Sequence, residues 1–222
     1  TRKSVGFCDV TTLGKIDVQG LDAAEFLNKI YSNSFAKLVV GKTRYGLMLR
    51  EDGIAKDDGT AARLADDHFV VTTTTANAIS VYRHMEFARQ CLFPDMDVQL
   101  ISTTEAWAQY AVAGPNARKL LQKIVDPEFD LSNDGFPFMA CGNITVCGGL
   151  RARLFRISFS GELAYEIAVP TRYGDALIRR IMEAGAEFDV VPYGTEALGV
   201  MRIEKGHATG NELNGTTTAL NL

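Results

Sequence analysis

The chain has 222 residues, of which 46% are hydrophobic and 23% charged, and its formal net charge is -4. This length can bury a sizeable core, in one large domain or two small interwoven ones. Because the net charge is negative, the chain has no general electrostatic attraction for the phosphate backbone of a nucleic acid, so no nucleic-acid partner is expected. No apolar run is long enough to cross a bilayer and the first residues lead into no signal segment, so we expect a cytoplasmic protein without a membrane partner.

The four cysteines form no Cys-x-x-Cys pair, and the three histidines are scattered along the chain. Neither zinc nor an iron–sulfur cluster has the ligand spacing that it needs, so no metal site is predicted. Each cysteine is expected to be a small buried apolar residue in a reducing compartment.

The first elements are a strand and a helix. Alternating residues predict a strand over 15–19. Asp22, with Glu25 three residues later, predicts a capping box at the start of a helix. The apolar face of that helix carries Phe26, Leu27, Ile30 and Tyr31.

A hairpin is predicted over 47–64. Alternating apolar residues precede a break at Asp52-Gly53, the local signal for a strand that turns back. Asp57 and Asp58 follow, and on an extended backbone their side chains point to opposite faces, so only one of them can face a cleft. That carboxylate could hold or accept a proton. Alternatively, Asp-Asp-Gly simply shapes a second turn.

The middle of the chain alternates between strands and helices. A strand is predicted over 68–72, then a helix over 76–91 with Ile79, Tyr82 and Met85 at helical spacing. Segments 97–101 and 107–112 are predicted to form a strand pair. Gly114-Pro115-Asn116 then opens a helix with Ala117, Leu120, Leu121 and Ile124 inward.

The last third begins with a loose segment, 131–149. A long strand over 150–159 turns at 160–162 into a strand over 163–169. Glu166 stands there between apolar neighbours, so it lies on a solvated face or is a recognition carboxylate. A helix over 173–184, a strand over 188–190 and a helix over 195–205 complete the chain. Gly206 caps the last helix, and Arg202 in its final turn would ordinarily offset the helix dipole.

These elements predict the α+β class, with two interlocked antiparallel-sheet units and flanking helices. The first unit is expected to contain residues 1–50 with 140–222, and the second residues 51–139.

Several segments in this order resemble one family, the aminomethyltransferase (glycine-cleavage T-protein) superfamily of tetrahydrofolate-binding domains. The resemblance extends to the folate-binding region of the sarcosine oxidase alpha subunit. The segments that carry it are Phe7 to Lys15, Leu47 to Arg63, Val112 to Ala117, Gly161 to Ile167, and Arg202 to His207. The resemblance implies a T-protein-like fold. It also implies a fragment of a larger polypeptide, because family members continue into a further small β domain.

The resemblance implies roles for individual residues. Asp58 matches the family's working aspartate, which positions the folate nitrogens and relays a proton. Glu166 matches the glutamate that grips the pterin, since a carboxylate accepts two parallel N–H bonds. Tyr45 and Arg202 match residues that line the folate site. Phe159 keeps a stacking ring where the family has tyrosine, but loses the hydroxyl.

The change at Phe159 favours the sarcosine oxidase branch, and so does the absence from 208–210 of the tyrosine often found after the last helix. Ile54 replaces the second glycine of the family's turn. His207 stands where a relative that maintains iron–sulfur clusters has cysteine.

The resemblance implies that an iminium from sarcosine oxidation is captured on tetrahydrofolate, giving 5,10-methylenetetrahydrofolate. Flavin and any NAD would belong to other domains or to flavoprotein subunits of a hetero-oligomeric oxidase. Two alternatives stay open. One is a folate-binding or subunit-docking module without chemistry of its own, and the other is the glycine-cleavage aminomethyltransferase itself.

Overall fold

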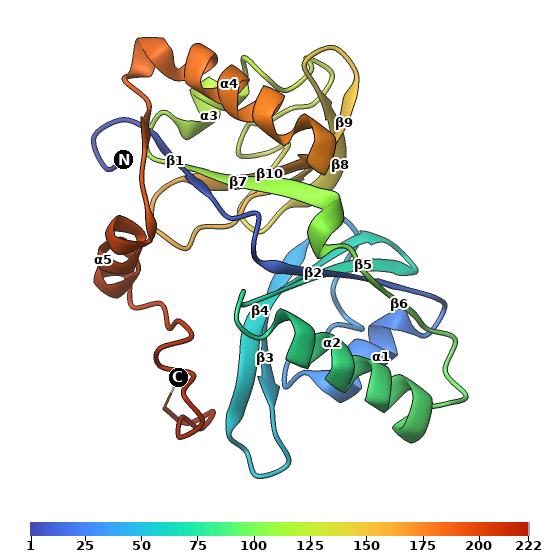
Figure 1. Ribbon diagram of the computed structural model, residues 1–222. Helices are drawn as coiled ribbons and strands as arrows, with labels where there is room; N and C mark the ends of the chain where they lie inside the picture. Colours follow the sequence, from blue (N-terminus) through green and yellow to red (C-terminus); the bar gives the residue numbers. More distant parts are fainter. Residues whose placement is uncertain (222) are drawn as a thin grey trace. The chain divides into compact units, whose positions relative to one another are not determined.

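The computed structural model describes residues 1–221 and divides the chain into two compact units (Figure 1). Unit 1 contains Thr1–Thr11 and Glu105–His207, and unit 2 contains Thr12–Thr104 and Ala208–Leu222. The expected α+β class with two sheets and flanking helices is confirmed. The division differs from the boundaries expected from the sequence, because strand pairing between distant segments decides which residues share a sheet.

Unit 1 is built on a six-stranded sheet with the order β11-β1-β7-β10-β9-β8. Neighbouring strands of this sheet are antiparallel, except for β1 and β11, which pair in parallel. The strands are β1 (Gly6–Asp9), β7 (Trp107–Ala113), β8 (Cys141–Val146), β9 (Leu150–Phe155), β10 (Ala164–Pro170) and β11 (Val191–Pro192). The helices are α3 (Ala117–Leu121), α4 (Gly174–Gly185) and α5 (Thr195–Lys205), with short 3-10 turns at Thr171–Tyr173 and Ala186–Phe188. A third 3-10 turn, Thr104–Ala106, begins with the last residue of the first segment of unit 2.

The core of unit 1 lies between this sheet and helices α3 and α4 (Figure 1). Alternate residues of each strand reach it, such as Val112, Tyr165 and Ile167, which are fully buried. Because successive strand residues point to opposite faces, Gln109 and Glu166 lie on the face away from α3 and α4.

Unit 2 is built on an antiparallel five-stranded sheet with the order β3-β4-β5-β2-β6. Its helices α1 and α2 pack their apolar side chains on one face, where Phe26, Phe69 and Met85 are fully buried. The strands are β2 (Gly14–Gln19), β3 (Thr43–Leu49), β4 (Ala55–Ala65), β5 (His68–Thr73) and β6 (Gln99–Ser102). The helices are α1 (Ala23–Ile30) and α2 (Ala78–Phe87), which a π-helical turn at Ala88–Leu92 extends.

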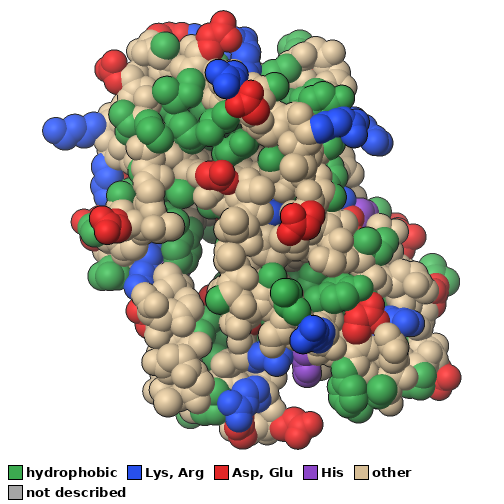
Figure 2. Space-filling model, viewed as in Figure 1, with side chains coloured by type: hydrophobic (Ala, Val, Ile, Leu, Met, Phe, Trp, Pro, Cys, Tyr) green, Lys and Arg blue, Asp and Glu red, His purple; other side chains and the backbone are tan. Residues whose placement is uncertain are grey.

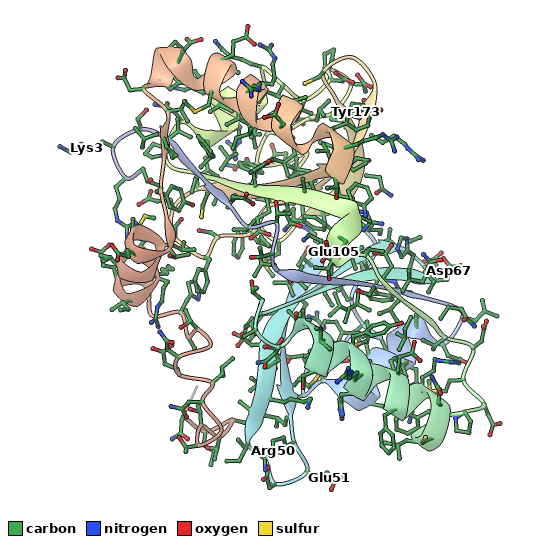
Figure 3. The ribbon with its side chains drawn as sticks, viewed as in Figure 1. Lys3, Arg50, Glu51, Asp67, Glu105 and Tyr173 are labelled. Carbon is green, nitrogen blue, oxygen red and sulfur yellow. The ribbon has the colours of Figure 1, made fainter. Side chains whose placement is uncertain are left out.

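The hairpin predicted around Asp52-Gly53 is confirmed as the β3–β4 pair, whose tip carries Arg50 and Glu51 in Figure 3. Gly53 has a φ of 80°, which suits a glycine in a tight turn. Asp57 and Asp58 lie within β4 and pair with Met48 and Leu47, so the alternative of a second turn is wrong.

Several local predictions differ from the structure. The capping box does not form, because the Asp22 carboxylate accepts a hydrogen bond from the Asp97 amide at 2.8 Å and makes no cap bond within its helix. Ile79, one of the three residues at helical spacing, is 68% exposed. Cys91 and Cys147 are exposed, so the expectation that every cysteine is buried is wrong. The last predicted strand lies later, at Val191–Pro192. Helix α5 and its Gly206 cap, with a φ of 86°, are confirmed.

Sheet membership was harder to predict than the strands themselves. The expected strand pair of 97–101 and 107–112 is wrong, because β6 pairs with β2 while β7 pairs with β1 and β10. The segment expected to be loose contains β8. Among residues 1–221, no helix has both the length and the apolar character that crossing a membrane requires.

Candidate functional site

The first candidate pair in unit 2 is Tyr45 and Asp58. The Tyr45 hydroxyl donates a hydrogen bond to Oδ2 of Asp58 at 2.8 Å. The two residues are diagonal neighbours, because Tyr45 lies opposite Thr60 and Asp58 lies opposite Leu47. Asp58 points away from the core that contains Ala61, since residues an odd number apart on a strand face opposite sides.

The phenol of Tyr45 is held in its protonated form. Burial raises the pKa of Tyr45, and the negative charge of Asp58 raises it further. A protonated phenol can only donate to the carboxylate, so it fixes the orientation of Asp58. An oriented, half-buried carboxylate of this kind can act as a general base.

Asp57 has a different environment from its neighbour. Its side chain is 2% exposed and accepts hydrogen bonds from the Thr74 amide at 3.2 Å, the Thr74 hydroxyl at 2.6 Å and the Asn77 amide group at 3.1 Å. Burial raises the pKa of Asp57, while these hydrogen bonds act in the opposite direction. Since Asn77 is the N-cap residue of α2, Asp57 ties β4 to the start of that helix.

In unit 1, the carboxylate of Glu166 is held by Gln109. Gln109 lies on β7 opposite Ala168, one diagonal step from Glu166 on β10, and its side-chain amide donates to Oε2 of Glu166. Gln109 is 1% exposed, so this donor is shielded from water. Glu166 therefore presents a half-buried carboxylate with a fixed orientation.

Two further groups lie in the field of Glu166. Burial raises the pKa of the Cys8 thiol, and the charges of Asp9 and Glu166 add to the effect. Burial likewise raises the pKa of Tyr193, with smaller contributions from Cys8 and Glu166. Both groups are therefore kept neutral at pH 7, and the negative charge near them comes from the carboxylates of Asp9 and Glu166.

Phe159 and Arg202 are connected through His207. The rings of Phe159 and His207 stack with centroids 5.7 Å apart and planes at 21°. Nη1 of Arg202 donates to the backbone carbonyl of His207 at 3.2 Å, and the His207 amide donates to the Arg202 carbonyl at 2.9 Å. Arg202 is 8% exposed, so its guanidinium is held inside the unit near the end of α5.

The structure thus brings the expected site residues together in three sets, one in unit 2 and two in unit 1. These sets are Tyr45 with Asp58, Glu166 with Gln109, and Phe159 with Arg202 by way of His207. On the face of the molecule seen in Figure 2, acidic and basic side chains are interspersed. Within residues 1–221, no three His, Cys, Asp or Glu side chains gather as metal ligands would.

Sequence reasoning missed Gln109 and His207. Gln109 carried a usable signal, because it is the one amide among the apolar residues of β7, just as Glu166 is the one carboxylate of β10. His207 carried none, since its ring contact is with Phe159, in a segment far away in the sequence.

A half-buried carboxylate that a neighbouring side chain holds in place can bind a polar ligand or accept a proton. The family model "GCVT N-terminal domain" matches residues 1–222. The chain belongs to this family, which confirms the expected resemblance.

Two relatives illustrate the range of the family. The sarcosine oxidase subunit alpha of Rhizobium meliloti (strain 1021) is 56% identical over 222 residues, which are 100% of this chain and 22% of the relative. An aminomethyltransferase of Chloroherpeton thalassium (strain ATCC 35110 / GB-78) is 30% identical over 217 residues, which are 97% of this chain and 58% of the relative. The chain therefore spans about a fifth of the first relative's length and over half of the second's.

Solved structures share the fold. The glycine cleavage system aminomethyltransferase T from Bartonella henselae superimposes with a TM-score of 0.84 at 26% identity, over 98% of this chain and 56% of that one. A chain of the heterotetrameric sarcosine oxidase from Corynebacterium sp. U-96 superimposes with a TM-score of 0.62 at 12% identity, over 85% of this chain and 87% of that one. The latter likeness shows the fold alone.

Proposed function

We propose that this chain is the folate-dependent one-carbon transferase domain of a sarcosine oxidase-type enzyme. In this proposal tetrahydrofolate would take up the one-carbon unit of an iminium from sarcosine oxidation, which would give 5,10-methylenetetrahydrofolate, and the amine nitrogen of the iminium would leave as glycine. The observation that carries it is the Glu166 carboxylate, half-buried on a sheet face and held by the buried Gln109. The identity of 56% with a protein named sarcosine oxidase subunit alpha supports the choice of branch.

The side chains of the proposed site fit a reduced folate. Its amino-pyrimidine edge needs an acceptor for two parallel N–H groups, and a carboxylate such as Glu166 provides it. Its flat ring needs a stacking partner, and the ring of Phe159, in a residue that is 36% exposed, is available for one. The guanidinium of Arg202 adds a positive charge to the side chains of the proposed site.

The proposal gives the two acidic residues separate roles. Glu166 binds and orients the ligand, while Asp58 accepts a proton at its carboxylate and Tyr45 holds that carboxylate in place. Bound tetrahydrofolate supplies the nucleophilic nitrogen that takes up the one-carbon unit. General-base help of this kind contributes about 10²- to 10⁴-fold to a rate.

Titration of the protein with tetrahydrofolate tests the binding role. Glu166→Ala should weaken binding strongly, while Glu183→Ala, which removes an exposed carboxylate of α4, should leave it unchanged. Equal binding by wild type and Glu166→Ala, or binding by neither, would overturn the assignment of Glu166.

Asp58→Ala tests the chemistry. If the chain is an enzyme, the Asp58→Ala variant should no longer form 5,10-methylenetetrahydrofolate, while its folate binding should weaken only partly. A binding or docking module has no such activity to lose, so an inactive wild type that still binds folate would favour that alternative. The flavin would come from partner subunits or from other domains.

The glycine-cleavage aminomethyltransferase is a second candidate, because the superposition on the Bartonella henselae enzyme covers 98% of this chain. Its substrate is an aminomethyl group on a lipoyl carrier. Turnover with that carrier but not with sarcosine would favour this second candidate.

A further inference from the structure

Arg2 contacts two separate segments of unit 1. Its Nη1 donates to Oε1 of Glu162 at 2.5 Å and to the carbonyl of Ser160 at 3.3 Å. Its Nη2 donates to Oε2 of Glu204 and, at 3.5 Å, to the carbonyl of Met201. One guanidinium therefore joins the turn 158–162 to the last turns of α5.

Both segments carry residues of the proposed folate site. Phe159 lies in the turn, and Arg202 lies in α5. The two segments also pack closely, because a Cβ added to Gly161 would meet the stem of Lys205 at 3.0 Å, and Gly161 has a φ of 79°. The stacked rings of Phe159 and His207 form a second connection between the same two segments.

We propose that Arg2 is a positioning residue for the folate site, which holds the turn 158–162 against α5 so that the Phe159 ring stays aligned with His207 and Arg202. This inference rests on the proposed function. Arginine suits the task because its planar fork can engage carboxylates and carbonyls in several directions at once, which a lysine ammonium cannot do with the same geometry.

The effect of Arg2 concerns geometry more than stability. An exposed ion pair contributes little to the free energy of unfolding, and the Arg2 side chain is 40% exposed. Misplacing a ring that stacks on a ligand, in contrast, lowers affinity directly. Arg2 variants should therefore fold normally and bind folate less tightly.

The first test compares folate affinity among variants by calorimetry. Arg2→Ala should weaken tetrahydrofolate binding about three- to tenfold, and Arg2→Lys should lie between Arg2→Ala and wild type. The matched control is Arg179→Ala, which breaks an exposed ion pair of 2.8 Å with Asp175 on α4 and should bind like wild type. Unchanged affinity in Arg2→Ala would overturn the inference.

A double-mutant cycle identifies the route of the effect. If Arg2 acts through the ring of Phe159, Arg2→Ala should cost little further affinity in a Phe159→Ala background. If the fold-losses in folate affinity of the two single variants simply multiply in the double variant, Arg2 does not act through Phe159. That result would also overturn the inference.

Hydrogen exchange provides a measurement that needs no folate. Backbone amides of the turn 158–162 should exchange faster in Arg2→Ala than in wild type or Arg179→Ala. If the wild type bound no folate, the proposed function would fail, and exchange would still decide whether Arg2 holds the turn. Equal exchange in all three proteins would contradict the positioning role.

Discussion

The buried amide of Gln109 donates a hydrogen bond to the carboxylate of Glu166 across two neighbouring strands of one sheet. Hydrogen bonds to charged groups contribute roughly 1.5–3 kcal/mol, about twice the value for neutral pairs. Because the donor is buried, water cannot replace it without opening the sheet. The orientation of Glu166 therefore depends on a residue of a different strand.

Gln109→Leu removes this donor with little change in side-chain volume. Glu166 should then lose its fixed orientation, and the affinity for tetrahydrofolate should fall at least tenfold, as the loss of a charged hydrogen bond predicts. Calorimetric titration measures the change. Gln122→Leu serves as the control, because Gln122 is an exposed residue that follows α3. Equal affinities in wild type and Gln109→Leu would refute the positioning of Glu166 by Gln109.

Tyr45→Phe removes the hydroxyl that donates to Asp58 and keeps the ring. The carboxylate then loses this hydrogen bond, so we expect the rate of one-carbon transfer to fall about tenfold, as the loss of one hydrogen bond to a charged group predicts. Folate affinity should change less than the rate, since the ring remains. Single-turnover rates and titrations measured on the same preparation separate the two effects. A variant with the wild-type rate would show that Tyr45 does not support Asp58.

Local signals predicted much of this fold. The turn at Asp52-Gly53 and the cap at Gly206 both follow from backbone preferences that a few neighbouring residues determine. The opposite environments of Asp57 and Asp58 likewise follow from the strand period of two.

Non-local pairing explains most of what the sequence did not predict. Nothing in β6 or β7 indicates that the two strands pair in different sheets, because that depends on the partners β2, β1 and β10. The pair of Gln109 and Glu166 and the stack of Phe159 and His207 arise in the same way, since their members are far apart in the sequence. The resemblance to a family singled out Glu166 and Phe159 but not the residues that hold them.

Gly59 allows a test of how tightly Asp58 is placed. A Cβ at this position would lie 1.9 Å from the carbonyl oxygen of Thr72 on the neighbouring strand, and backbone atoms cannot move aside as a flexible side chain would. Gly59→Ala should therefore cost about 1–3 kcal/mol of unfolding free energy, the usual range for overpacking. It should also slow one-carbon transfer, because β4 must shift next to Asp58.

Gly199→Ala is the matched control for this substitution. Gly199 lies inside α5, and an added Cβ would meet no atom within 4 Å. Alanine is the better helix former, so this variant should be more stable by roughly 0.5–1 kcal/mol. Urea unfolding curves of both variants measure the two effects. Destabilisation of the same size at both positions would contradict the close approach at Gly59.

Asp57 should make the stability of unit 2 depend on pH. Burial raises the pKa of Asp57 above its ordinary value of 3.8, despite hydrogen bonds from Thr74 and Asn77. Between 3.8 and this higher pKa, the folded state binds more protons than the unfolded state. The contribution of Asp57 to the unfolding free energy is therefore greatest below pH 3.8 and decreases as the pH rises through the pKa of the folded state.

Asp57→Asn removes this titration. The variant should be less stable than wild type at every pH, by about 1–3 kcal/mol, because asparagine has a single acceptor oxygen for the donors of Thr74 and Asn77. The difference between wild type and variant should be larger at pH 3 than at pH 7, since only the wild type gains from protonation. Urea unfolding at pH 3 and pH 7 measures this difference in unfolding free energy. Because both proteins share all other carboxylates, the titration of those carboxylates cancels in the difference. A difference that grows with rising pH would mean that the hydrogen bonds outweigh burial and that the pKa of Asp57 is lowered.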